Sequence, residues 1–82
     1  MTSYRCTFDR IGRHQDVEPL TAAADTADDL AEAIYRYARP KLASREIEVH
    51  VDLNPGTGGT GVILIGGFRN GGEITIEEVP AP

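Results

Sequence analysis

The sequence predicts a two-layer α+β domain of ββαβββ type, in which one amphipathic helix packs on a mixed or antiparallel sheet. Only residues 26–44 carry a strong helical pattern. The segments on both sides of them alternate apolar and polar residues, which is the two-residue period of a half-buried strand. The chain of 82 residues is long enough for one hydrophobic core. We therefore expect a single domain over residues 1–82 with a frayed tail at 80–82, and a β-grasp arrangement is compatible with this order of elements.

The first two predicted strands precede the helix. Residues 4–11 are expected to form the first strand, because alternate positions there hold the apolar residues Tyr4, Cys6 and Phe8. Residues 12–14 are expected to form a turn. The next segment, 15–23, contains Pro19, which has no backbone N–H to donate. The second strand is therefore expected at a sheet edge or a bulge.

The predicted helix begins at Thr26, whose hydroxyl can accept a hydrogen bond from the first turn, with Asp29 three residues on. One face is apolar at steps of three and four residues: Ala27, Leu30, Ala31, Ile34, Ala38 and Leu42. Pro40 cannot donate to the carbonyl of Arg36, so the helix either kinks there or gives way to a separate short turn through Ser44. A kink with a frayed last turn is the expected outcome.

A three-stranded meander is predicted after the helix. Residues 46–53 give the clearest strand, since every second residue is apolar. Residues 54–61 contain four glycines and are expected to form a mobile loop. Residues 62–68 read as the next strand and 73–79 as the last one. Between them, 69–72 include an Asn-Gly pair, which favours a tight hairpin connection.

The net charge of −5 is unevenly distributed. From Glu46 onward, six acidic residues face a single base, Arg69, and this part accounts for the whole excess. A one-sided acidic field repels nucleic acid and attracts basic partners. The single cysteine excludes an internal disulfide, the N-terminal residues are too polar for a signal peptide, and the longest uninterrupted apolar run has four residues. A cytoplasmic protein without membrane contact is therefore expected.

No constellation of residues indicates catalysis, a cofactor or a metal. Gly56, Gly58 and Gly61 match the letters G-x-G-x-x-G, but a strand follows them, whereas a dinucleotide fingerprint needs a helix N-terminus there. His14 and His50 lack a second histidine or a cysteine at ligand spacing. Cys6 shares its face with aromatic residues and is expected to be a core thiol. We therefore expect a protein that is not an enzyme and that holds no cofactor.

One segment suggests an interface, because it is apolar on both faces although one helix can cover only one side of a sheet. Its residues, with two glycines that permit close approach, are Val62, Ile63, Leu64, Ile65, Gly66 and Gly67. Either the N-terminal hairpin or the glycine loop shields the second face, or a second chain packs there. The second explanation predicts a small interaction module that self-associates through the sheet, most simply as a two-fold homodimer, and that binds a protein partner not yet identified.

Two alternatives remain for the charged residues. An arginine-rich patch would make the protein a nucleic-acid-binding accessory protein, and its members would be Arg10, Arg13, Arg36, Arg39 and Arg45. Conversely, the acidic sheet could imitate a phosphate array and act as a nucleic-acid mimic that inhibits another protein.

Overall fold

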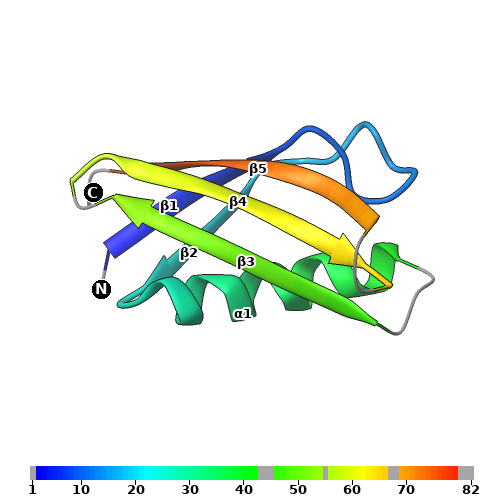
Figure 1. Cartoon of the computed structure of the whole chain (residues 1–82). Coiled ribbons are helices and arrows are strands. Elements are labelled where there is room, and N and C mark those ends of the chain that lie inside the picture. Colours follow the sequence, from blue (N-terminus) through cyan, green and yellow to red (C-terminus); the bar gives the residue numbers. More distant parts are fainter. Residues whose placement is uncertain (1, 43–45, 55, 67–68, 80–82) are drawn as a thin grey trace.

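A computed structural model describes residues 2–42, 46–54, 56–66 and 69–79. One helix lies against the concave side of a curled five-stranded sheet (Figure 1). The elements in chain order are β1 (Thr2–Phe8), β2 (Leu20–Ala24), α1 (Ala27–Ala38), the short 3-10 turn η1 (Arg39–Lys41), β3 (Ile47–Asn54), β4 (Gly58–Ile65) and β5 (Arg69–Val79). The predicted α+β class and the ββαβββ order are confirmed.

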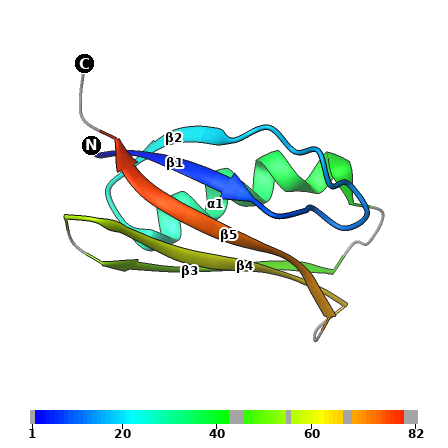
Figure 2. The same cartoon turned by 90° about the horizontal axis from the view of Figure 1, so that it is seen from above.

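The strand order in the sheet is β2-β1-β5-β4-β3, and all four pairings are antiparallel. Of the two sheet types that the sequence left open, the structure thus has the antiparallel one. Its central strands β1 and β5 run in opposite directions, whereas the central strands of a β-grasp run parallel. The sheet arches over α1, so that both edge strands, β2 and β3, contact the helix (Figure 2).

Helix α1 begins where the capping residue predicts. The hydroxyl of Thr26 accepts a hydrogen bond from the Asp29 N–H at 3.1 Å. The predicted kink at Pro40 is wrong, because α1 ends at Ala38 and Pro40 lies in η1. A proline cannot donate to the carbonyl four residues earlier, and the chain tightens instead into a 3-10 turn closed by Leu42 N–H. The last two residues of the predicted helix, 43 and 44, lie outside the described residues.

The core lies between α1 and the concave face of the sheet. Tyr4 is half-buried on the expected face of β1, and the buried apolar residues are Cys6, Phe8, Ile11, Ala24, Leu30, Ile34, Ala38, Ile47, Ile63, Ile74 and Ile76. The ring of Tyr37 lies 5.6 Å from that of Phe8, and its hydroxyl donates to the Glu18 carbonyl at 2.8 Å. These contacts hold the segment between β1 and β2 on the helix side of the sheet.

The predicted mobile loop at 54–61 is wrong. β4 already begins at Gly58, and its glycines pair with β3 and β5. A Cβ atom on Gly59 would collide with the carbonyl oxygen of Asp52 on the neighbouring strand. Glycine is present here because the backbones approach too closely for a side chain, and not because the chain must be mobile.

The predicted tight connection at 69–72 is also wrong, because β5 begins at Arg69. Gly71 forms a bulge: Ile63 pairs with Gly72 and Leu64 with Asn70, which leaves Gly71 without an opposite residue. The side chain of Asn70 accepts the Gly72 N–H at 2.9 Å. The Asn-Gly pair therefore shapes a bulge inside a strand instead of a hairpin turn.

Candidate functional site

The predicted interface residues are divided between the two faces of β4. Ile63 is 0% exposed and Ile65 packs against the core, so both face the helix. Val62 and Leu64 alternate with them, face the convex outer side of the sheet and are half-buried. Gly66 follows β4 and is exposed, and Gly67 lies outside the described residues.

Within the described residues, neither the N-terminal hairpin nor the glycine segment shields the outer face of the sheet. The N-terminal hairpin extends the same sheet as β1 and β2, and the connection between these strands is held on the helix side by the Tyr37 hydroxyl. The glycine segment belongs largely to β4 itself. Val62 and Leu64 therefore remain at a surface that α1 does not reach.

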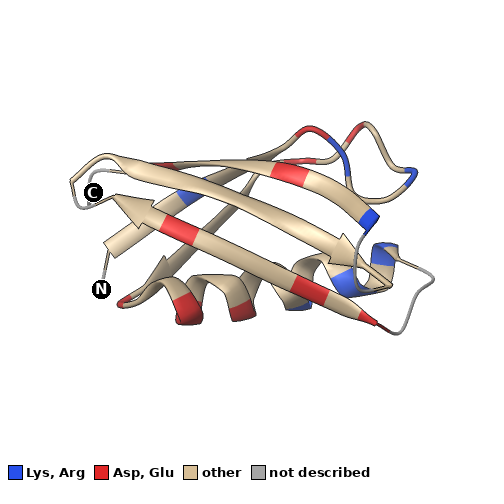
Figure 3. Ribbon diagram, viewed as in Figure 1, with Lys and Arg blue, Asp and Glu red and all other residues tan. Residues whose placement is uncertain are grey.

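Charged and polar residues surround this apolar pair. Val62 lies between His50 and Glu73 in the strand register, and Leu64 lies between Glu48 and Asn70. Figure 3 shows the acidic positions along β3 and β5. The outer face is thus acidic with a narrow apolar centre.

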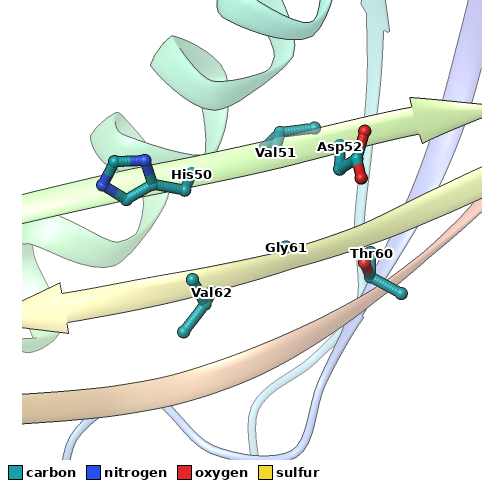
Figure 4. A pocket seen from close by; sticks show the side chains of 6 residues that line it. All are labelled: His50, Val51, Asp52, Thr60, Gly61 and Val62. Carbon is teal, nitrogen blue, oxygen red and sulfur yellow. The ribbon is translucent and has the colours of Figure 1, made fainter.

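A shallow depression of about 230 Å³ lies on β3 and β4 beside Val62 (Figure 4). It is lined by His50, Val51, Asp52, Thr60, Gly61 and Val62. The His50 Nε2 atom lies 3.1 Å from the Glu48 carboxylate, and both side chains are exposed. Among the described residues, no three histidine, cysteine, aspartate or glutamate side chains are grouped closely enough to hold a metal ion. The depression is also smaller than the roughly 300–1,000 Å³ of typical small-molecule sites.

The edge strand β3 presents a second feature of the sheet, which the sequence analysis missed. Gly66 N–H donates to Glu46 O at 2.9 Å, so the pair Glu46 and Gly66 is hydrogen-bonded across the ladder. Antiparallel pairs alternate, and therefore the backbone groups of Val49, Val51 and Leu53 point away from β4. In the described sheet β3 has a neighbouring strand on one side only.

The predicted arginine patch is only partly assembled. Arg10 uses its guanidinium within the fold, where it donates to Gly12 O at 3.2 Å and to Asn70 O at 2.9 Å. It thereby ties the turn after β1 to the start of β5. Arg13 extends from the same turn and is exposed.

The helical arginines lie on the solvent side of α1 and η1. Arg36 donates to Glu32 at 2.7 Å, and Arg39 donates to the Tyr35 hydroxyl at 2.6 Å. Arg45 lies outside the described residues. Three of the five predicted residues, including Arg10, are therefore engaged within the protein.

A cleft of about 500 Å³ opens at the end of the molecule where α1 stops. It is lined by Gly12, Arg13, His14, Lys41, Leu42, Ile65 and Arg69. Figure 3 shows lysine and arginine positions gathered at this end. The sequence analysis did not include Arg69 in a basic patch, because its position after a strand gave no sign of its proximity to residues 12–14 and 41–42.

A second cleft, of about 560 Å³, lies near the N-terminus of α1. Three acidic residues line it, namely Asp25, Asp52 and Glu78, and its other lining residues are neutral. The two clefts therefore differ in charge and lie near opposite ends of α1.

The only cysteine is a core residue, as expected. Cys6 is 0% exposed, and its burial raises the pKa of the thiol to about 11. The neutral thiol is therefore the stable form at physiological pH, and it is a poor nucleophile.

No family model, curated protein or solved structure matches the chain. Among the described residues, no helix is both long and apolar enough to cross a membrane. The function of the protein is therefore inferred from the geometry of its surfaces.

Proposed function

We propose that this protein is a small, non-enzymatic interaction module that self-associates through its sheet, by antiparallel pairing of β3 with β3 of a second copy. The observation that carries the proposal is the regular edge of β3, which presents the outward backbone groups of Val49, Val51 and Leu53. Such an edge is a template for another strand. Proline and bulges usually block edge pairing, and β3 contains neither.

The side chains of β3 support an added strand. Val49, Val51 and Leu53 face the helix but are only half-buried, since the sheet ends beside them. A strand from a second copy would cover their exposed sides and pair with their outward backbone groups. Both contributions favour pairing over continued exposure of the edge to water.

Charge selects the register of such a pair. A two-fold axis through Val51 places His50 opposite Asp52 of the partner subunit, and Glu48 opposite Asn54 of the partner subunit. An axis through His50 would instead place Glu48 opposite Asp52 of the partner subunit, and like charges directly opposite are destabilising. The sequence of β3 therefore favours the axis at Val51.

Face-to-face packing of two outer sheet surfaces receives less support. Val62 and Leu64 offer apolar contact there, but they stand among Glu48 and Glu73. A two-fold face contact would bring these carboxylates together. Edge pairing avoids this repulsion and leaves a continuous acidic outer surface across both copies, which suits a basic protein partner.

The nucleic-acid alternative also receives less support from the geometry. Arg10, Arg36 and Arg39 are used within the fold. The outer face of the sheet is acidic, and its field repels a long nucleic acid.

Sedimentation equilibrium of the full chain over a range of concentrations tests self-association. We expect a monomer–dimer equilibrium that Val51→Pro abolishes, because the Val51 N–H points away from β4 and proline is tolerated at that side of an edge strand. Circular dichroism verifies that the variant is folded. A monomeric wild-type protein, or a folded Val51→Pro variant that still dimerises, would overturn the proposal.

Charge exchange tests the register. Asp52→His alone should weaken dimerisation, because two imidazoles then face each other. The double exchange His50→Asp with Asp52→His should restore it, since an imidazole then faces a carboxylate again. Equal dimerisation of the single and the double variant would exclude the axis at Val51.

A further inference from the structure

The cleft at the end of α1 brings together basic residues from distant parts of the chain. Arg13 and His14 come from the turn after β1, Lys41 comes from η1, and Arg69 is the first residue of β5. No acidic side chain is among the described residues that line it. The chain has a net charge of −5, so this cleft is locally basic on a protein that is acidic overall.

Two of these cations have no partner within the described structure. The guanidinium groups of Arg13 and Arg69 form no hydrogen bond or ion pair with other described residues. The Lys41 Nζ atom lies 4.3 Å from the centroid of the Tyr37 ring, which leaves its N–H donors available to an anion. Like charges gathered around one cleft repel each other, and a bound anion would relieve this repulsion.

The walls of the cleft are held by backbone contacts. Ile11 and His14 exchange two hydrogen bonds of 2.9 Å, and Gly12 N–H donates to Gly71 O at 2.7 Å. Arg10 adds the two bonds to Gly12 and Asn70 carbonyls described above. Arg13 and His14 therefore project from a turn that is fixed to β5 before any ligand arrives, which lowers the entropy lost on binding.

The cleft also has an apolar part. Leu42 and Ile65 line it between the basic residues, and both pack against the core. Its volume of about 500 Å³ falls within the range of about 300–1,000 Å³ found for small-molecule sites. A ligand that fits has a compact, multiply charged anion and an apolar or aromatic body.

We propose that this cleft binds a small organic phosphate of nucleotide size, with the phosphate held by Arg13, Lys41 and Arg69 and the body placed against Leu42 and Ile65. A phosphate monoester is favoured over a carboxylate, because its charge and three terminal oxygens can engage several cations at once, with arginine in bidentate geometry. This site goes beyond self-association and lies on different residues from the β3 edge.

A titration followed by ¹H–¹⁵N NMR, with adenosine 5′-monophosphate as the probe, tests the site. Shift changes are expected at residues 11–14, 41–42, 65 and 69. Adenosine, which lacks the phosphate, should not bind, and inorganic phosphate should bind more weakly than the nucleotide. Equal affinity for inorganic phosphate and the nucleotide, or shift changes elsewhere, would overturn the proposal.

Charge-removal variants complete the test. Arg69→Gln and Arg13→Gln should each weaken binding of adenosine 5′-monophosphate by about tenfold or more, because each removes a charge-assisted contact. Arg36→Gln is the matched control, since it removes the same charge from the exposed side of α1, and its affinity should stay unchanged. An equal loss in all three variants would show a general charge effect and refute the site. The NMR spectrum verifies folding, and Arg13 and Arg69 serve as independent tests if one variant does not fold.

Discussion

Gly59 shows how the absence of one side chain shapes the sheet. Its φ angle is not in the left-handed region, so an alanine could adopt its backbone conformation. Nevertheless a Cβ atom there would collide with the Asp52 carbonyl on β3. Gly56 presents the opposite case, with a φ of +84° and no atom near the position of a Cβ.

Gly59→Ala should therefore lower the free energy of unfolding by about 1–3 kcal/mol through overpacking. Gly56→Ala should cost about 1 kcal/mol, because it introduces only backbone strain. Urea denaturation of both variants provides the measurement. A Gly59→Ala variant as stable as the wild type would contradict the close approach of the β3 and β4 backbones at Asp52.

Cys6 makes a testable contribution to stability at alkaline pH. Its pKa is raised from 9.0 to about 11 by burial, so the folded state disfavours the thiolate. This contribution is fully present below pH 9 and is lost as the pH rises from 9 toward 11.

We expect the free energy of unfolding to fall more steeply between pH 9 and 11 in the wild type than in Cys6→Ala. The comparison is needed because tyrosine and lysine residues titrate in the same interval. Identical pH dependence of the two proteins would contradict a buried thiol.

At the scale of the element, α1 is stabilised by its start and bounded by its end. Thr26 caps the first turn, and Pro40 stops the regular hydrogen bonding. Between them Leu30, Ile34 and Ala38 pack into the core. The two edge strands rest against this one helix, and therefore the stability of α1 affects both edges of the sheet.

Thr26→Ala should lower the free energy of unfolding by about 1 kcal/mol, because the Asp29 N–H loses its acceptor. Thr26→Ser keeps the hydroxyl and should remain close to the wild type. Thermal unfolding of the three proteins measures the difference. Equal stability of the alanine and serine variants would show that the cap contributes nothing.

At the scale of the whole molecule, charge is separated along the helix. The acidic cleft with Asp25, Asp52 and Glu78 lies near the start of α1, and the cationic cleft lies beyond its end. The β3 edge, which we propose for self-association, uses neither Arg13 nor Arg69. The two proposed surfaces are therefore expected to act independently.

Arg13→Gln combined with Arg69→Gln should leave the monomer–dimer equilibrium unchanged. Conversely, Val51→Pro should alter the affinity for adenosine 5′-monophosphate by less than about twofold, since distant sites without shared contacts behave additively. Sedimentation and NMR titration of both variants give the result. Coupled losses would mean that the cleft forms only in the dimer.

The sequence by itself determined the features that depend on neighbouring residues. The cap at Thr26, the buried face of α1 and the alternating faces of β1, β3 and β5 follow from local periodicity, which is why they were predicted correctly. The expected kink at Pro40 was wrong, because a separate short turn accommodates the missing N–H equally well.

Only the tertiary structure decided the features that depend on contacts between distant segments. A glycine-rich sequence suggests a flexible backbone, yet Gly59 and Gly71 lie where neighbouring strands pack too closely for a side chain. No local sequence pattern reveals this packing. The same reason applies to the proposed sites. Strand order makes β3 an edge, and the antiparallel pairing brings Arg69 beside Arg13 and Lys41, whose separation in sequence hides a shared cleft.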